Sequence, residues 1–319
     1  MIPINPPTMS LKLPQVSIIV PLYNEEKMFV HLVERLMNLL DSFQPVTQVV
    51  MVNDGSTDNT PILMAELSAG DPRFKSVFLS RNHGHQLAVS AGLTCADAEE
   101  AVMIIDGDLQ DPPELISDFY KKLQEGYDVI YAIRKNRKEG FMLKFLFWSY
   151  YRVQKMVSNY DIPMDVGDFC MISKRVRDII VSMPEESRYL RGMRSWIGFR
   201  QYGYEYDRGE RQEGDSKYSI KKRVEIGLNG IFNFSKVPIR FMYWLGFLSI
   251  LLSILYTLLL LYLRFTSHVL PDGYITLIFA ISFFSGVQLI MLALIGEYVY
   301  RIHNQVRQRP LFIIDKVIN

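Results

Sequence analysis

Two long stretches without a charged side chain lie near the C-terminal end of the chain. One runs from Phe241 to Leu263 and the other from Gly273 to Gly296. Each exceeds the roughly 20 apolar residues that a helix needs to cross the hydrocarbon core of a bilayer. Because only a short segment separates them, they predict a transmembrane hairpin, with helices at 241–263 and 274–299, rather than two buried helices of a soluble core.

Positive charge on either side of this hairpin predicts its orientation. Lys236 and Arg240 precede the first stretch, and the second is followed by Arg301, Arg307 and Arg309. Cytoplasmic loops of membrane proteins carry an excess of Lys and Arg. We therefore expect a multi-pass protein of the inner (cytoplasmic) membrane, with both the N-terminal domain at 16–218 and a tail at 300–319 in the cytoplasm.

The N-terminal domain alternates between apolar runs and helical stretches, after a lead-in at 1–15 that we expect to be flexible. The apolar runs are at 16–20, 48–52, 76–79, 101–105 and 128–132, and the helical stretches are at 25–40, 60–67, 86–95 and 113–125. Unbroken apolar strands are typical of parallel sheets that helices cover on both faces. We predict an α/β fold with a mostly parallel sheet and helices on both faces.

Polar side chains follow several of these predicted strands. Tyr23 comes after the first strand, Asp54 after the second, and Asp106 and Asp108 after the fourth. Ligands of such sheets bind outside the carboxyl ends of the strands. Tyr23 can stack on a base, and Asp54 can accept a hydrogen bond from a base N–H. Each of these residues also fits turn or helix-cap chemistry, but their convergence on one edge favours a nucleotide site.

The spacing of Asp106 and Asp108 indicates a metal site. In an extended segment, residues two apart point the same way, so both carboxylates can face one hard cation. Mg²⁺ and Mn²⁺ take oxygen ligands from carboxylates, water and substrate phosphates. A polar loop between strand and helix is the alternative. The chain has no Gly-x-Gly-x-x-Gly after its first strand and no Gly-Lys-Ser/Thr loop, which disfavours dehydrogenases and P-loop NTPases.

Charge and composition narrow the choice of partners. The chain has 35 Lys and Arg against 34 Asp and Glu, so we expect no nucleic-acid partner. Residues 141–160 mix aromatic side chains with Lys and Arg, and 219–240 begins with a basic cluster. Such segments suit helices that lie in the membrane interface, with core helices as the alternative.

Four motifs occur in a fixed order before the two apolar stretches: VSIIVPLYNEE, VNDGSTDNT, SRNHGHQLAVSAGL and DGDLQDPPE. In this order the chain resembles family-2 glycosyltransferases of the polyprenyl-phosphate type, a group that includes bactoprenol glucosyltransferases and dolichyl-phosphate mannose synthases. The resemblance extends from about Val16 to Ile314. The closing segment IGEYVYRIHNQVRQRPLF is similar to that of bactoprenol glucosyltransferases in particular.

The resemblance implies a GT-A-like nucleotide-sugar domain and assigns roles to individual residues. It places the nucleotide sugar at Pro21, Tyr23, Glu25, Asp54 and Asp106, and Mg²⁺ or Mn²⁺ at Asp106, Asp108 and Gln110. The catalytic carboxylate would be Asp168 or Asp165, with Asp168 the better match to the family pattern. The acceptor phosphate would lie near Arg134, Arg137, Arg208, Arg211, Ser216 and Lys217.

The resemblance also implies the reaction. One sugar would pass from a nucleotide donor to the phosphate of a membrane polyprenol, with inversion at the anomeric carbon. We expect UDP-glucose and undecaprenyl phosphate, with GDP-mannose, a UDP-N-acetylhexosamine or a UDP-aminoarabinose derivative as other donors. A non-enzymatic scaffold or translocation partner is the alternative class.

A processive synthase does not fit the sequence. The segment 191–196 (RGMRSW) lacks the Gln-x-x-Arg-Trp pattern of those enzymes, and two spans are too few for a polymer channel in one chain. The sequence leaves open a homo-oligomer in which several chains combine their transmembrane helices.

Overall fold

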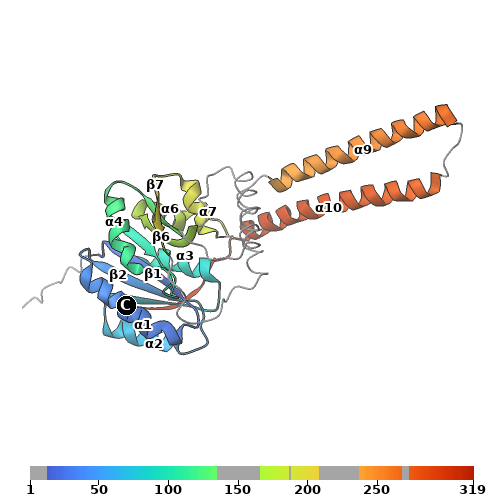
Figure 1. Cartoon of the computed structure of the whole chain (residues 1–319). Coiled ribbons are helices and arrows are strands. Elements are labelled where there is room, and N and C mark those ends of the chain that lie inside the picture. Colours follow the sequence, from blue (N-terminus) through green and yellow to red (C-terminus); the bar gives the residue numbers. More distant parts are fainter. Residues whose placement is uncertain (1–12, 135–165, 187, 208–236, 268–272) are drawn as a thin grey trace, which may run out of the picture. The chain divides into compact units, whose positions relative to one another are not determined.

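The computed structural model describes residues 13–134, 166–186, 188–207, 237–267 and 273–319 (Figure 1). It divides into two compact units. The first contains the N-terminal domain together with residues 310–319, and the second is built on the two long C-terminal helices. The interfacial segment predicted at 141–160 lies outside the described residues. Of the one predicted at 219–240, only 237–240 is described, and it forms the start of the helix α9 (Val237–Ser267).

The first unit is a sheet flanked by helices. Its strands are β1 (Val16–Leu22), β2 (Thr47–Asn53), β3 (Phe74–Leu79), β4 (Ala101–Ile104), β5 (Val129–Arg134), β6 (Val166–Ser173), β7 (Gln201–Tyr206) and β8 (Ile314–Ile318). Its helices are α1 (Glu26–Ser42), α2 (Thr60–Gly70), α3 (His85–Cys95), the 3-10 turn η1 (Pro113–Leu115), α4 (Ile116–Gln124), α6 (Lys174–Ser182) and α7 (Leu190–Ile197). The five strands and four helical stretches expected from the apolar pattern are thus all present.

The strands form one sheet in the order β7-β5-β6-β4-β1-β2-β3-β8. β4, β1, β2 and β3 pair in parallel, as do β5 and β7. β6 is antiparallel to both of its neighbours, and β8 is antiparallel to β3. The sheet is therefore mixed. The predicted parallel arrangement is found among β1 to β4, the strands that alternate with helices along the chain.

Helices cover both faces of the sheet. Leu32 and Leu36 of α1, Met64 of α2 and Phe119 of α4 join the core on one face. On the other face α3 packs on β1 and β2, α6 packs on β4 and β6, and α7 packs on β6. Every residue of β1 and β2 is buried, because side chains of both alternating sets meet a layer of helices.

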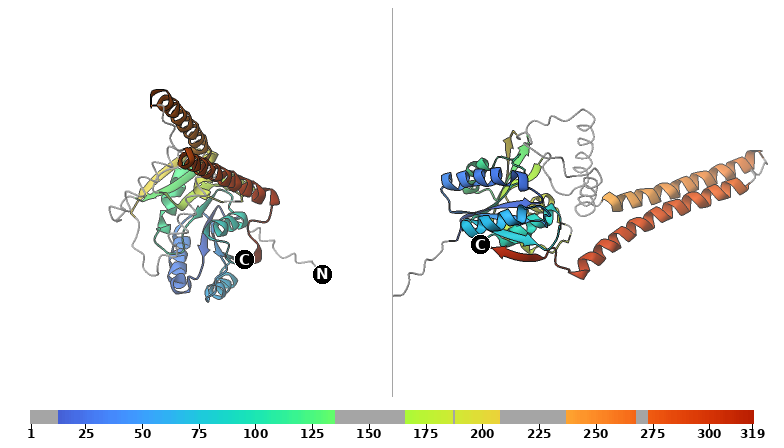
Figure 2. Two further views of the ribbon diagram at one scale, coloured as in Figure 1. Left: turned by 90° about the vertical axis from the view of Figure 1, so that its right-hand side faces the viewer. Right: turned by 90° about the horizontal axis from the view of Figure 1, so that it is seen from below.

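The C-terminal residues provide a strand that the sequence analysis placed in a tail. Ile314–Ile318 forms β8, which Figure 2 shows as the dark red strand at the edge of the sheet, beside the C label. Ser80 N–H also donates to the Ile313 carbonyl at 3.0 Å. The strand covers the open edge of β3, whose backbone donors and acceptors would otherwise lack partners in the sheet.

The second unit contains α9 (Val237–Ser267) and α10 (Gly273–Arg307), which contact each other (Figure 1). Both are longer than the predicted spans. Among the described residues, one helical stretch, Phe283–Arg307, is long and apolar enough to cross a membrane, and the apolar stretch of α9, Met242–Tyr256, is shorter. One membrane helix is thus supported, and the two-helix hairpin stays a prediction.

Candidate active site

The loops after β1 and β2 are joined by hydrogen bonds at the carboxyl edge of the sheet. Asn24 has a left-handed φ of 52°. Its N–H donates to Ser56 Oγ at 3.0 Å, and its Oδ1 accepts from Thr57 N–H at 2.8 Å. Tyr23 beside it is 37% exposed. The ring predicted to stack on a base therefore projects from a fixed loop and remains accessible.

Asp54 is buried and holds the loop that follows β3. Its Oδ1 accepts from His83 N–H at 2.7 Å, and its Oδ2 accepts from Gly84 N–H at 3.0 Å. Gly55 has a φ of 66°, and a Cβ there would lie 2.4 Å from Asn82 N. Only glycine allows this approach. Burial raises the pKa of Asp54 above its ordinary value, although the two backbone hydrogen bonds lower it in part.

Asp106 and Asp108 lie in a turn after β4, not in the extended segment that was predicted for them. The chain turns at Gly107, where a Cβ would lie 2.6 Å from Leu22 Cδ2, and Leu109 has a φ of 55°. Asp106 Oδ1 pairs with His85 Nε2 at 2.9 Å, and Asp108 Oδ1 accepts from Gln110 N–H at 3.2 Å.

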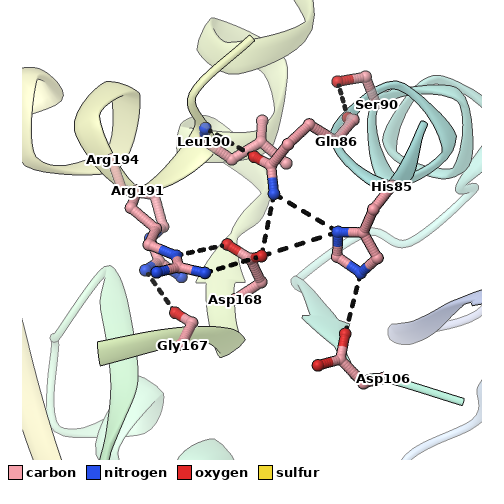
Figure 3. A network of polar contacts seen from close by, with 9 residues as sticks. All are labelled: His85, Gln86, Ser90, Asp106, Gly167, Asp168, Leu190, Arg191 and Arg194. Carbon is pink, nitrogen blue, oxygen red and sulfur yellow. Dashed lines mark hydrogen bonds and ion pairs between the residues drawn. The ribbon is translucent and has the colours of Figure 1, made fainter. Parts of the chain in front are cut away.

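The antiparallel pairing of β6 places Asp168 beside this turn. Ile104 of β4 pairs with Cys170 of β6, so the same register continued by two residues sets Asp168 opposite Asp106. His85, the first residue of α3, lies between them: its Nδ1 is 3.7 Å from Asp168 Oδ2. Figure 3 shows Asp168 on one side of the imidazole and Asp106 on the other.

Two helices hold Asp168 from the side away from Asp106. Arg191 of α7 donates to it through Nε at 2.9 Å and Nη2 at 3.3 Å. Gln86 Nε2 donates to Asp168 Oδ2 at 2.9 Å, while Gln86 Oε1 accepts from Leu190 N–H at 3.1 Å. Arg194 reaches the Gly167 carbonyl at 3.2 Å. The Gln86 amide therefore joins the start of α7 to the carboxylate.

These contacts decide the charge state of the site. Burial by itself would raise the pKa of Asp168, but the charge and hydrogen bonds of Arg191, with His85 and Arg194, outweigh it and hold the pKa below its ordinary value. Burial lowers the pKa of His85, yet Asp106 and Asp168 outweigh that effect and raise it to about 9. At neutral pH the site thus holds an ionised carboxylate among cations.

The chemistry of the turn fits a divalent cation. Asp106 and Asp108 offer carboxylate oxygens and Gln110 an amide oxygen, which are the donors that Mg²⁺ and Mn²⁺ prefer. Within the described ranges, no group of three or more His, Cys, Asp or Glu side chains is arranged to hold a metal. A cation here would therefore need further oxygens from water and from the diphosphate of a bound nucleotide.

Several predicted site residues cannot be placed. Asp165, Arg137, Arg208, Arg211, Ser216 and Lys217 lie outside the described residues, as does the side chain of Arg134 at the end of β5. Pro21 is buried in β1, and Glu25 is half-buried with its N–H donating to Thr60 Oγ1 at 3.0 Å. The structure thus brings together the predicted residues on β1, β2, β4 and β6 only.

Three residues of the site were not predicted from the sequence: His85, Gln86 and Arg191. His85 and Gln86 belong to the motif SRNHGHQLAVSAGL, which follows β3 and contains the start of α3. The other polar clusters also lie between the end of a strand and the start of a helix. A polar cluster at the carboxyl end of the third strand was the available signal. Arg191 gave no comparable local signal, because α7 reaches the site only through the placement of β6.

Comparison with known sequences identifies the class of protein. The model of the family described as glycosyl transferase family 2 matches residues 17–180. The chain belongs to this family and is a glycosyltransferase.

Relatives resemble the chain over nearly its whole length. An uncharacterized glycosyltransferase, YkcC of Bacillus subtilis, is 39% identical over 303 residues, covering 95% of this chain and 94% of the relative. The SfII prophage-derived bactoprenol glucosyl transferase of Shigella flexneri is 34% identical over 304 residues, covering 95% and 98%. Among solved structures, glucosyl-3-phosphoglycerate synthase from Mycobacterium tuberculosis with Mn²⁺, UDP-glucose and glycerol 3-phosphate is 14% identical, with a TM-score of 0.44 over 67% of this chain and 76% of that one.

Proposed function

We propose that this glycosyltransferase moves a single sugar from a nucleotide sugar to the phosphate of a membrane polyprenol, with inversion at the anomeric carbon. The proposed donor is UDP-glucose and the proposed acceptor is undecaprenyl phosphate. One observation carries the proposal: the likeness to bactoprenol glucosyl transferases covers about 95% of the chain, and so includes the apolar helix α10 as well as the catalytic domain.

The donor half of the proposed site is the carboxyl edge of β1, β2 and β4. Tyr23, Pro21, Glu25 and Asp54 would bind the nucleoside, and the Asp106–Gln110 turn would face the diphosphate. Mg²⁺ or Mn²⁺ held by Asp106, Asp108 and Gln110 would supply positive charge for the departing diphosphate. The buried Asp54 keeps the loop from His83 to His85 in place, and so orients the start of α3 toward the same turn.

The acceptor half needs cations more than a base. A phosphate monoester has a second pKa of about 6 and is already an anion at neutral pH. Transfer then depends on in-line positioning and on donors that hold the acceptor oxygen without protonating it. Asp168 is the proposed carboxylate of this half. Arg134, Arg137, Arg208, Arg211, Ser216 and Lys217 remain the proposed phosphate contacts from the sequence.

The membrane arrangement follows from the two apolar helices. We infer that α9 and α10 cross the cytoplasmic membrane as a hairpin and that the catalytic domain lies on the cytoplasmic face, where nucleotide sugars are made. The described part of α10 supports one crossing, since Phe283–Arg307 is apolar and exposes its side chains. The crossing by α9 rests on the uncharged stretch from Phe241 to Leu263.

A transfer assay tests the proposal. The full chain in detergent would receive undecaprenyl phosphate, Mg²⁺ or Mn²⁺, and one radiolabelled sugar nucleotide at a time. Label that enters the organic phase from UDP-glucose supports both the reaction and the donor. Label from another donor keeps the reaction and changes the sugar. Absence of transfer from every donor, by protein that still binds UDP, overturns the proposed acceptor.

A metal-turn variant separates an enzyme from a scaffold. Asp108→Ala should abolish transfer, because it removes a proposed ligand of the cation. Asp97→Ala is the matched control, since Asp97 is an exposed carboxylate that pairs with Lys75 at 2.6 Å outside the site. A cellular phenotype that survives Asp108→Ala, with the protein at normal abundance, would favour the scaffold.

A further inference from the structure

We propose that Arg35 is a positioning residue for the divalent cation: from α1, it holds the turn that carries Asp108 and Gln110. This inference rests on the proposed function, which assigns the cation to that turn. It adds a residue that lies outside the proposed ligands and acts on them through the backbone of Leu109.

The Arg35 guanidinium joins the Asp106–Gln110 turn to the 3-10 turn η1 that follows it. Its Nε and Nη2 donate to the two carboxylate oxygens of Glu114 at 2.6 Å and 2.8 Å. Its Nη1 donates to the Leu109 carbonyl at 3.4 Å. A guanidinium that is paired with a carboxylate through two nitrogens has a fixed plane, so Glu114 aims the third nitrogen of Arg35 at Leu109.

Leu109 is the residue of this turn that most needs support. Its φ of 55° is left-handed, which a bulky side chain rarely adopts and which persists only where the surroundings hold it. The Leu109 side chain is buried at 8% exposure, so packing holds the side chain while Arg35 holds the carbonyl. Asp108 Oδ1 accepts from Gln110 N–H at 3.2 Å across Leu109. The backbone of Leu109 therefore decides how these two proposed ligands face each other.

Helix α1 connects this turn with the nucleoside side of the donor site. At its start, Glu26 N–H donates to Asp58 Oδ2 at 3.1 Å, and Glu26 Oε1 accepts from Asn59 Nδ2 at 2.7 Å. These two bonds tie the helix to the loop after β2. Arg35 lies roughly 14 Å further along the same helix. Through Arg35, one helix thus sets the distance between the nucleoside loops and the turn proposed to hold the cation.

The sign of the expected effect distinguishes positioning from simple charge. The side chains of Arg35 and Glu114 are 33% and 54% exposed, and their charges offset each other. Removal of Arg35 leaves the negative charge of Glu114 near the turn, which by charge alone would strengthen the binding of a cation. If Arg35 holds the turn, its removal weakens that binding instead, because the proposed ligands lose their fixed arrangement.

The test measures Mn²⁺ binding by the full chain in detergent at saturating UDP, through the electron paramagnetic resonance signal of free Mn²⁺. Arg35→Ala should weaken the affinity for Mn²⁺ roughly 3- to 10-fold. Its affinity for UDP in EDTA should stay within about twofold of wild type. In the transfer assay the variant should need more Mn²⁺ for half its maximal rate, with kcat at saturating Mn²⁺ near wild type. A general loss of structure would not give that division.

Arg73→Ala is the matched control. Arg73 also pairs with a carboxylate through Nε and Nη2, which contact Asp71 at 3.0 Å and 2.7 Å, and its Nη1 reaches Asp41 of the same helix α1 at 2.7 Å. The Arg73 side chain is 39% exposed, close to the value for Arg35, but it lies before β3, at the edge of the sheet away from the turn. Arg73→Ala should leave the affinity for Mn²⁺ within about twofold of wild type.

A second variant tests whether the effect passes through Leu109. Leu109→Ile keeps the number of atoms, but a branched Cβ is tolerated less well at a left-handed φ. It should weaken Mn²⁺ binding by at least roughly 3-fold and spare UDP binding in EDTA. The double variant with Arg35→Ala should lose less than the two single losses combined, because both changes act on one turn.

Three results would overturn the inference. They are unchanged or tighter Mn²⁺ binding by folded Arg35→Ala protein, an equal loss of Mn²⁺ affinity in Arg73→Ala, and fully additive losses in the double variant. Absence of Mn²⁺ binding by UDP-bound wild type would overturn both the proposed cation and the role of Arg35. Wild type that binds UDP and Mn²⁺ but transfers no sugar would contradict the proposed acceptor, whereas the shift in Mn²⁺ affinity would still support the role of Arg35. The two failures are therefore distinguishable.

Discussion

The two edges of the sheet each hold a buried aspartate paired with an arginine from a helix. One aspartate lies in β6, and the other accepts a hydrogen bond from the last residue of β6. At the carboxyl edge of the central parallel strands, Asp168 pairs with Arg191. At the opposite edge, where β5 begins and β6 ends, Asp128 pairs with Arg175 and also accepts from Ser173 Oγ at 3.0 Å. Asp128 is 4% exposed and Asp168 is 8% exposed, so burial alone does not separate the two.

The two ion pairs differ in the further residues that each aspartate contacts. The partners of Asp128 fix the end of β6 to the start of β5, since Asp128 O also accepts from Ser173 N–H at 2.8 Å. Asp168 is joined to α3 by Gln86 and lies near His85, which contacts a second carboxylate, Asp106. A buried ion pair by itself is a common feature of folds. Its connection to further charged groups at the carboxyl edge is what marks a site.

Between these two edges, the larger effect on transfer is predicted at Asp168. Asp168→Asn keeps the shape of the side chain but removes the charge that holds Arg191, so kcat/KM for transfer should fall on the order of 100-fold. The measurement is label transfer to polyprenyl phosphate at limiting acceptor. UDP binding by the same variant should remain, because Asp54 and the loop after β2 are untouched. An activity within a few-fold of wild type would remove the distinction between the two edges.

A second prediction concerns the loop geometry of the carboxyl edge. Gly55→Ala would place a methyl group 2.4 Å from Asn82 N at a φ of 66°, which forces the loops after β2 and β3 apart. UDP affinity should fall roughly 10-fold, because a left-handed alanine alone costs about 1–2 kcal/mol and the clash adds to it. Calorimetric titration with UDP measures the effect.

Gly70→Ala is the matched control for this change. Gly70 ends α2, has a negative φ, and no atom lies within 4 Å of a Cβ built there. UDP affinity should stay unchanged, and helix propensity should leave the stability equal or slightly higher. Equal losses of affinity in both variants would mean that UDP does not use the loop that Asp54 holds.

A third, smaller effect on activity is expected at the opposite edge. Asp128→Asn should lower the free energy of unfolding by about 1–3 kcal/mol, because the buried site loses a hydrogen-bonded charge. Transfer per folded molecule should stay within about twofold of wild type. Thermal unfolding of detergent-solubilised protein gives the stability, and the transfer assay gives the activity. A loss of acceptor binding here would show that β6 transmits changes along its length.

The same comparison explains how much of the fold and of the site could be predicted from the sequence. The strands β1 to β5 are local apolar runs, and the described polar residues after β1, β2 and β4 lie at one edge of the sheet, as predicted. The placement of β6 is non-local: a segment of 31 residues separates β5 from β6 along the chain, yet β6 lies between β4 and β5. No local periodicity encodes that insertion, so the contacts of Asp168 with Gln86 and Arg191 could not be derived.

The other differences have similar causes. Asp106 and Asp108 were treated as neighbours on an extended segment, but Gly107 packs against Leu22 and turns the chain. β8 comes from the segment LFIIDKVIN, whose apolar run was visible. Its pairing with β3, more than 200 residues earlier, was not. In each instance a tertiary contact decided what the local pattern left open.

The smallest predicted effect distinguishes a held carboxylate from a proton acceptor through pH. The folded-state pKa of Asp168 is held below the ordinary value of 3.8. The stability that its ionised form contributes is then fully present above that value, and is lost only as the pH falls toward the folded-state pKa. The difference in unfolding temperature between wild type and Asp168→Asn should therefore be constant from about pH 4.5 to about pH 6 and shrink below about pH 4. This window also avoids the titration of His85, because a raised pKa of about 9 affects stability only above the ordinary histidine value. A difference that grows as the pH falls from about pH 6 to about pH 4.5 would instead give Asp168 a raised pKa, as a general base requires, and would contradict its assignment as a carboxylate held in the ionised form.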